Sequence, residues 1–200
     1  MKPLFLPLLV LVLRLLSLPA GAQPVPGKYL TKTGRITFFS ATPVEDIEAR
    51  NEQVAAVLDM GAGQLAFAVP IKAFMFKRTL MQEHFNENYL ESDKYPKATF
   101  TGRLLGIEAT ALGMPGPHLV RVEGELTMHG VTRRLQVPAT LELKDGQLLA
   151  AAQFGVDPAD YGIEVPLLVR ANIAKEISVR VALTCAPVAA GVGLAPRPAK

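Results

Sequence analysis

Tryptophan is absent from this sequence of 200 residues, and cysteine occurs only once, as Cys185. A single cysteine excludes an intramolecular disulfide, so the fold must be stabilised by its apolar core. Cys185 is in phase with the apolar positions of ISVRVALTC, which predicts a buried free thiol. Runs of like charge are also missing, so nothing in the charge pattern indicates nucleic acid as a partner.

The first 22 residues have the layout of a secretory signal peptide. Lys2 precedes a leucine-rich run, and Ala20-Gly21-Ala22 supplies the small residues for cleavage after Ala22. A membrane anchor is the alternative, but Arg14 and three prolines interrupt the run before the ~20 residues that a spanning helix needs. Loss of Lys2 and Arg14 with the leader lowers the formal charge from +3 to +1. We therefore expect an exported protein, periplasmic in a Gram-negative bacterium or secreted, with no membrane span in the mature chain.

One domain is expected after the leader. Residues 23–187 are long enough to bury a sizeable core, and they carry almost all of the regular patterning. Residues 188–200, VAAGVGLAPRPAK, are rich in glycine, proline and alanine without periodicity. This composition predicts a disordered C-terminal tail.

Alternation of apolar and polar residues with a period of two dominates the mature sequence. His129-Gly130 and Asp145-Gly146 separate alternating runs and are typical of tight hairpin turns. The pattern therefore predicts about eight antiparallel strands, over residues 29–40, 46–58, 64–69, 98–108, 121–128, 135–143, 148–156 and 177–185.

Only one stretch has the period of a helix. Within residues 77–89, Met81, Phe85 and Tyr89 fall at positions i, i+4 and i+8, and polar residues cover the other side. Pro96 prevents any continuation, because the residue before a proline is disfavoured in the helical region. Residues 157–162 predict a second, short helical turn.

An all-β domain with one apolar face on each strand can be a sandwich or a closed barrel, and periodicity does not separate these two. Small residues on the apolar face favour a hollow barrel, because they leave volume that no tryptophan fills. The alternative is that the glycines mark bulges or close strand crossings. The small residues in question are Gly102, Gly106, Gly124, Ala139, Ala150 and Ala152.

A search for catalytic chemistry finds none of the usual motifs. The sequence has no G-x-S-x-G, no H-E-x-x-H, no P-loop and no C-x-x-C. His84 beside Glu83 and Glu87 could form a metal pair, but too few further ligands can be named, and a residue at the edge of the helix stripe is the simpler interpretation. His129 occupies a turn, where its tolerance of positive φ is explanation enough. We predict no catalytic residue, no metal site and no enzyme activity.

Aromatic and large aliphatic side chains are then the candidates for a function. A pocket for an apolar molecule is lined by the same residue types as a core, so the sequence does not separate the two residue by residue. The candidate cavity residues are Phe38, Phe67, Phe74, Phe76, Met81, Phe85, Tyr89, Phe100, Leu126, Phe154 and Tyr161.

Four segments resemble the YceI-like family of exported polyisoprenoid-binding proteins: NENYLESDKYPKATFTGRL, GELTMHGVTRRLQVPATLEL, FGVDPADYGIEVP and EISVRVALT. The resemblance spans residues 27–185. It implies a lipocalin-like antiparallel barrel with an apolar cavity for an isoprenoid or similar amphiphile, and it implies no catalysis. It also implies that the Met81/Phe85/Tyr89 stripe covers part of the barrel and that residues 91–97 form the corner back into it.

The favoured hypothesis is therefore a binding or carrier protein for an isoprenoid, a quinone or a similar apolar amphiphile, with no other cofactor. A barrel with a filled core, acting in protein interaction or stress response without a ligand, is the alternative. The sequence leaves the oligomeric state open, with a homodimer among the options.

Overall fold

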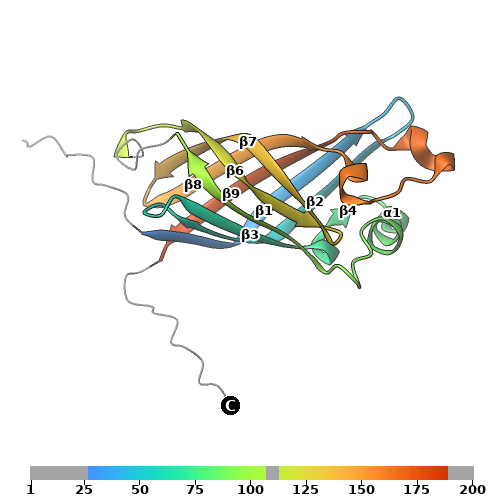
Figure 1. Cartoon of the computed structure of the whole chain (residues 1–200), viewed down its shortest axis with the longest axis horizontal. Coiled ribbons are helices and arrows are strands. Elements are labelled where there is room, and N and C mark those ends of the chain that lie inside the picture. The colour runs from blue at the N-terminus through green and yellow to red at the C-terminus, as the bar shows by residue number, and fades with distance from the viewer. Residues whose placement is uncertain (1–26, 107–112, 189–200) are drawn as a thin grey trace, which may run out of the picture.

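Strands account for most of the residues that the structure describes, which are residues 27–106 and 113–188 of a computed structural model (Figure 1). The expected signal peptide and most of the expected tail lie outside the described residues. The strands are β1 (Lys28–Ala41), β2 (Asp46–Asp59), β3 (Gln64–Pro70), β4 (Met75–Phe76), β5 (Lys97–Leu105), β6 (His118–Met128), β7 (Val131–Lys144), β8 (Gln147–Val156) and β9 (Ile177–Pro187).

Helical segments are short and connect the strands. The α-helix α1 (Thr79–His84) continues into one wider turn, η2 (Phe85–Tyr89), so the helical period of residues 77–89 is confirmed. The 3-10 turns that lie wholly within the described residues are η1 (Ile71–Ala73), η4 (Pro158–Tyr161) and η5 (Leu167–Asn172). The expected turn at residues 157–162 is η4, whereas η5 has no counterpart in the sequence prediction. No helix in the described part of the chain is long and apolar enough to cross a membrane.

Eight of the strands close into an antiparallel barrel, which decides between the two all-β architectures. The order is β1-β9-β8-β7-β6-β5-β3-β2, β1 pairs with β2 to close the sheet, and the short β4 adds to β2. Closure removes the sheet edges that a sandwich would leave. The predicted single barrel of about eight strands with one or two short helices is confirmed.

Two hairpins turn as the sequence predicts. His129 and Gly130 both have positive φ, at 52° and 75°, and Asp145 and Gly146 repeat this with 51° and 76°. Positive φ at both central residues is the mark of the type I′ turn, whose twist matches that of the flanking strands. These turns fix the registers of β6 with β7 and of β7 with β8.

The half of the barrel where β1 begins and β9 ends is filled by side chains. Val188 donates its backbone N–H to the carbonyl of Lys28 at 2.7 Å, so the first and last strands meet at this end. The buried residues in this half include Tyr29, Leu58, Leu65, Val120, Val122, Leu141, Leu148 and Leu183. This half of the lumen therefore has the filled core that the alternative hypothesis expects for the whole barrel.

Cys185 is a fully buried free thiol in that core, as predicted. Burial raises the pKa of the Cys185 thiol to about 11 by disfavouring the thiolate. Because the thiolate is the reactive form, we expect no alkylation of the native protein by iodoacetamide between pH 7 and pH 9 and rapid alkylation in denaturant. Mass analysis of the two samples is the test, and rapid native alkylation would contradict the buried placement.

The small inward residues do not create the hollow space that the sequence prediction assigned to them. A methyl group added at Gly102 would lie 2.8 Å from the Phe100 ring, and one added at Gly124 would lie 2.6 Å from it. The two glycines therefore accommodate Phe100 and a close approach of β5 to β6, which is the alternative interpretation. Ala139 is buried in the core and Ala150 and Ala152 pack against it, while Gly106 lies beyond the end of β5.

Substitution of Gly102 by alanine tests this close packing. The new methyl group would overlap the Phe100 ring and the Glu123 carbonyl, so we expect the free energy of unfolding to fall by about 1–3 kcal/mol in urea denaturation. Gly61→Ala is the matched control, because its added carbon would be 3.5 Å from its nearest neighbour and its φ is not positive. Equal effects of the two substitutions would contradict the role of Phe100.

Candidate functional site

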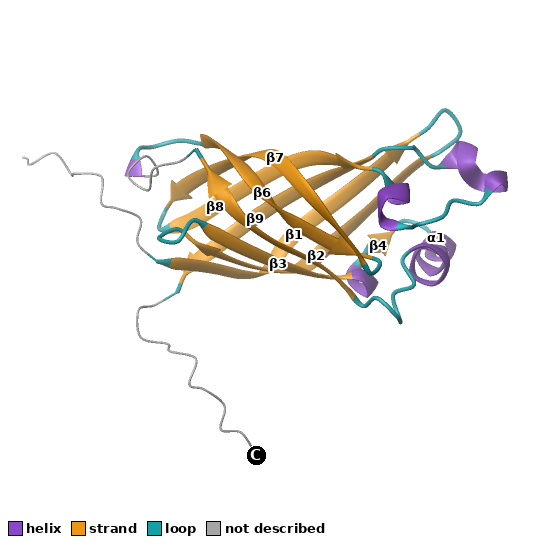
Figure 2. Ribbon diagram, viewed as in Figure 1, coloured by secondary structure: helices purple, strands orange, loops and turns teal. Residues whose placement is uncertain are grey.

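An open pocket occupies the barrel end opposite the one where β1 begins and β9 ends. Figure 2 shows α1 and the 3-10 turns η1, η4 and η5 gathered around this end. The cavity has a volume of about 380 Å³, within the usual range of small-molecule sites. Its wall is formed by inward-facing strand residues: Ile36, Phe38, Ser40, Ile47, Val69, Ala98, Leu126, Met128, Phe154, Val156, Ile177 and Val179.

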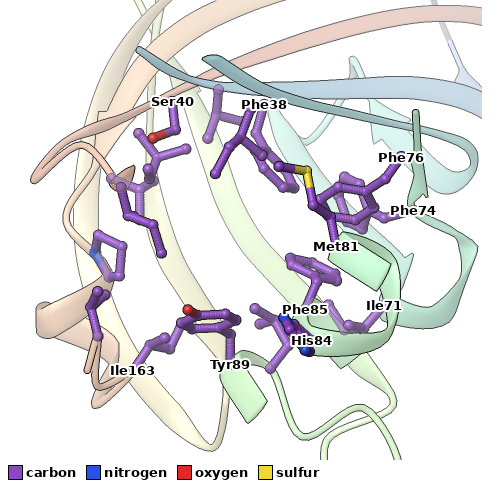
Figure 3. A pocket seen from close by; sticks show the side chains of 18 of the residues that line it. Phe38, Ser40, Ile71, Phe74, Phe76, Met81, His84, Phe85, Tyr89 and Ile163 are labelled. Atoms are coloured by element: carbon purple, nitrogen blue, oxygen red, sulfur yellow. The ribbon is translucent and has the colours of Figure 1, made fainter. Parts of the chain in front are cut away.

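Two covers extend over the wall and leave an open space between them, as Figure 3 shows. The first cover runs from η1 to η2 and the second from η4 to η5. Their side chains that line the pocket are mostly apolar. They are Ile71, Phe74, Phe76, Leu80, Met81, Phe85, Tyr89 and Leu90 in the first cover, and Pro158, Ile163, Val165, Val169 and Ile173 in the second.

Four phenylalanines hold the first cover against the barrel wall. Phe85 lies with its ring centroid 5.5 Å from that of Phe38, 5.5 Å from Phe74 and 5.0 Å from Phe76. Phe38 also contacts Phe74 at 5.4 Å and Phe76 at 5.7 Å. These spacings and their tilted or offset geometries are favourable for aromatic pairs. The cluster therefore fixes η2 to β1 without closing the pocket.

Hydrogen bonds position the ends of both covers. The amide of Asn51, fully buried in β2, donates to the carbonyl of Pro70 at 2.8 Å, and Asn51 Oδ1 accepts from the backbone N–H of Gln53 at 2.8 Å. The first cover thus begins at a fixed point beyond β3. In the second cover the backbone N–H of Ala174 donates to Ser40 Oγ at 2.8 Å.

The few polar groups of the pocket lie in the covers and around the opening. Arg78 Nη1 and Glu45 Oε1 form an ion pair at 2.5 Å, and His84 and Asn172 lie on the lining as well. Burial raises the pKa of Tyr89 above its usual value near 10, so its hydroxyl stays protonated at neutral pH and can donate a hydrogen bond. The interior is apolar and the polar groups are few, which is the usual design for an amphiphile.

His129 joins three segments beside the pocket, which is more than the turn role that the sequence predicts for it. Its Nε2 lies 2.9 Å from Glu91 Oε2, its Nδ1 lies 3.1 Å from the carbonyl oxygen of Tyr161, and its ring packs edge-on against Tyr95 with centroids 4.8 Å apart. The β6–β7 turn, the corner after η2 and η4 are thereby tied together. Glu91 itself has a positive φ of 42°.

We expect His129→Ala to lower the free energy of unfolding by about 1–3 kcal/mol, because it removes two polar contacts from a largely buried site. Amide exchange should also rise selectively in residues 90–95 and 158–163, and hydrogen-exchange mass spectrometry measures this. His118→Ala is the control, since His118 begins β6 and the one hydrogen bond of its side chain within the described residues is to the nearby Met114 carbonyl. Exchange that rises evenly over the whole barrel would contradict the local role.

Eight of the eleven predicted cavity residues lie on the pocket lining. They are Phe38, Phe74, Phe76, Met81, Phe85, Tyr89, Leu126 and Phe154. The other three are placed elsewhere. Phe67 and Phe100 pair with each other one inward position deeper, 5.9 Å between centroids, because Phe100 folds over Gly102 and Gly124. Tyr161 is buried in the core at η4. That any of these residues binds a ligand stays a prediction.

The sequence prediction did not include most of the aliphatic residues of the lining among its candidate cavity residues. Ile163 and Val165 alternate along the segment after η4, Val169 lies in η5, and Ile177 and Val179 alternate at the start of β9. The candidate list favoured aromatic residues, so these aliphatic residues were left out of it, although four of them follow a period of two. Among the described residues no three His, Cys, Asp or Glu side chains gather to hold a metal ion, so His84 has no such partners there.

Comparison with known proteins identifies the fold. A family model described as YceI-like domain matches residues 25–185. A polyisoprenoid-binding domain from Saccharophagus degradans, implicated in plant cell wall breakdown, is 16% identical over 82% of this chain and 99% of that chain, with a TM-score of 0.69. Burkholderia cenocepacia BcnA is 14% identical over 76% and 95% of the two chains, with a TM-score of 0.65.

A third solved structure, the Campylobacter jejuni YceI protein, is 13% identical over 72% of this chain and 86% of that chain, with a TM-score of 0.57. No curated protein matches the sequence. At these identities the solved structures establish the barrel, and the lining residues of this chain must be interpreted from its own geometry.

Proposed function

The chain belongs to the YceI-like domain family, and on that premise we propose that it binds an isoprenoid, a quinone or a similar apolar amphiphile in the open half of its barrel. The observation that carries this proposal is the cavity of about 380 Å³ with an almost wholly apolar lining. Such a surface gains free energy when an apolar chain replaces water, at about 0.8 kcal/mol for each buried methylene.

The tail of the ligand would lie between the two covers and point toward the filled half of the barrel. Along β1 the lining extends from Ile36 to Ser40, about 13 Å at the ~3.3 Å rise per residue of a strand. Below Ile36 the next inward residue is Gly34, where an added methyl group would overlap the Leu183 side chain. The Phe67 and Phe100 pair also lies one inward position below the lining, next to Val69 and Ala98. The pocket therefore has a floor, and this floor limits the length of chain that can be buried.

The head group would stay at the opening, where the polar groups are. The Tyr89 hydroxyl and the Arg78 guanidinium can donate hydrogen bonds to a carbonyl, hydroxyl or phosphate oxygen. Apolar burial distinguishes neighbouring chain lengths only weakly, so we propose selectivity for a class of amphiphile rather than for one molecule.

We further propose that the protein is exported and acts as a carrier, in the periplasm of a Gram-negative bacterium or after secretion. The layout of residues 1–22 supports this location. We place the chain with binding proteins rather than with enzymes, because the groups around the pocket are suited to holding a ligand and the sequence carries none of the common catalytic motifs.

Isothermal titration with quinones of increasing side-chain length tests the proposal. We expect saturable binding of one molecule per chain and a fall in Kd of about fourfold per added methylene, from ~0.8 kcal/mol each, until the chain reaches the floor. Longer chains should then bind no more tightly. Absence of saturable binding at every length would overturn the proposal and favour a barrel that acts through protein contacts.

A further inference from the structure

Two aromatic rings make up most of the floor of the pocket. On six strands of the barrel the first inward position below the lining is occupied by Gly34 in β1, Phe67 in β3, Phe100 in β5, Gly124 in β6, Ala152 in β8 and Val181 in β9. The phenylalanines are the large side chains of this set, and they are cross-strand partners with ring centroids 5.9 Å apart. The depth of the pocket therefore depends on these two rings.

Phe100 covers a part of the barrel wall that has no side chains of its own. Gly102 and Gly124 are cross-strand partners in β5 and β6, one inward position below the pair Phe100 and Leu126. An added methyl group would be 2.8 Å from the Phe100 ring at Gly102 and 2.6 Å from it at Gly124. The ring therefore points away from the opening and fills space by which the pocket would otherwise be deeper.

The position of the Phe100 ring is the boundary between the pocket and the filled core. Ala98 and Leu126, its neighbours along β5 and across to β6, both line the pocket. On the far side, Leu65 and Val122 are buried core residues. Space given up by the ring would thus open onto the pocket, whereas a ring displaced from the glycines could move only toward the opening.

We propose that Phe100, lying on Gly102 and Gly124, determines the longest chain that the pocket can bury. This inference rests on the proposed function and specifies its ligand class. An extended chain advances roughly 1.2 Å per bond, because three backbone bonds span about 3.6 Å. The wall of about 13 Å from Ile36 to Ser40 then holds on the order of ten chain carbons. The ligand is an amphiphile with a chain of about this length, and the remainder of any longer chain stays outside the opening.

Substitution of Phe100 by alanine should lengthen the pocket. The lost ring leaves space for roughly five or six further chain carbons where the neighbours do not collapse into it. Benzoquinones with unbranched alkyl side chains of increasing length are the probes, and isothermal titration gives Kd for each. In the parent protein Kd should stop falling at a limiting chain length, and in Phe100→Ala it should continue to fall beyond that length.

The readout is a ratio taken within one protein, so a general loss of affinity cancels. Kd for the chain at the parent's limit is divided by Kd for a chain about four carbons longer. We expect a ratio near one in the parent and of at least about tenfold in Phe100→Ala, since each buried methylene lowers Kd about fourfold. If Phe100→Ala does not fold, Phe100→Leu frees less space and should move the limit in the same direction by fewer carbons.

Gly102→Ala should move the limit in the opposite direction. Its methyl group would overlap the Phe100 ring, and the buried core below leaves the pocket as the side to which the ring can move. Kd should therefore stop falling at a shorter chain than in the parent, while Kd for the shortest chains stays unchanged. An unchanged or longer limit in this variant would contradict the support of the ring by the glycines.

Leu148→Ala is the matched control, because Leu148 is fully buried in the filled half and lies away from the pocket lining. It should lower the midpoint of urea denaturation and leave the limiting chain length unchanged. The same limit in the parent and the Phe100 variants, or an equal shift in Leu148→Ala, would overturn the role of Phe100 and leave the binding proposal intact. Absence of saturable binding by the parent at every chain length would instead reject the pocket ligand, and this inference with it.

Discussion

Replacement of Val179 by phenylalanine is expected to weaken ligand binding about fiftyfold without unfolding the barrel. Val179 faces the cavity between its cross-strand partners Phe38 and Phe154. A larger side chain there would take the space of about three methylene groups, each contributing about 0.8 kcal/mol to binding. Because the new ring enters open space, the free energy of unfolding should change by less than about 1 kcal/mol.

Val122→Phe is the matched control for this prediction, because Val122 has the same side chain but lies in the filled half of the barrel. There the larger ring must displace packed neighbours, so we expect a loss of about 1–3 kcal/mol in stability and an unchanged Kd. Isothermal titration and urea denaturation measure the two quantities. If Val179→Phe lost stability and kept its affinity, the cavity would not be the binding site.

The second large effect is expected for Phe85→Ala. Phe85 contacts three other phenylalanine rings, and each such pair contributes about 0.5–1.5 kcal/mol beyond its apolar burial. We expect the free energy of unfolding to fall by about 3 kcal/mol. The first cover should also separate from β1, so ligand dissociation should become faster.

Phe39→Ala serves as the control on the same strand. Phe39 faces outward beside Phe38, is partly exposed and has none of the ring contacts of the cluster. Its removal should cost less than about 1 kcal/mol and leave the ligand dissociation rate unchanged. Urea denaturation and stopped-flow displacement of a bound quinone give the two readouts. Equal losses in the two variants would show that the cluster does not hold the cover.

The strands were predictable because each buries one face. The period of two marks that face directly, and the pairs His129-Gly130 and Asp145-Gly146 mark the turns by their chemistry. Closure of the barrel was not predictable in the same way. It depends on the pairing of β1 with β2, and a sandwich built from the same strands would show the same alternation.

A bulge in β1 illustrates what periodicity misses. The register with β2 shifts between Thr31 and Ile36, so the inward face changes from Tyr29 and Thr31 to Ile36 and Phe38. The extra residue exchanges odd for even positions, and the strand prediction did not use the local sign of it, which is Gly34 within the shifted segment. The sequence prediction also misplaced the open space, because it attributed that space to the small inward residues. Glycine on an inward face can leave a void or receive a neighbouring ring, and only the fold shows that Phe100 fills the space.

The second cover was predicted only at its start, where the expected turn at residues 157–162 is η4, and η5 was missed because it follows neither period. η5 is a 3-10 turn with two exposed leucines, and its docking depends on the contact between Ala174 and Ser40, which are 134 residues apart. The first cover was predicted in part, since Met81, Phe85 and Tyr89 follow helical spacing and all line the pocket. Long-range contacts of this kind leave no trace in local spacing.

The most direct test of ligand binding is native mass spectrometry of the protein exported to a bacterial periplasm and purified without detergent, followed by organic extraction. We predict one adduct per chain that extracts as an isoprenoid, a quinone or a related amphiphile and is lost from Val179→Phe. A clean mass for the unliganded chain, unchanged after addition of quinones or polyprenols, would contradict the binding role.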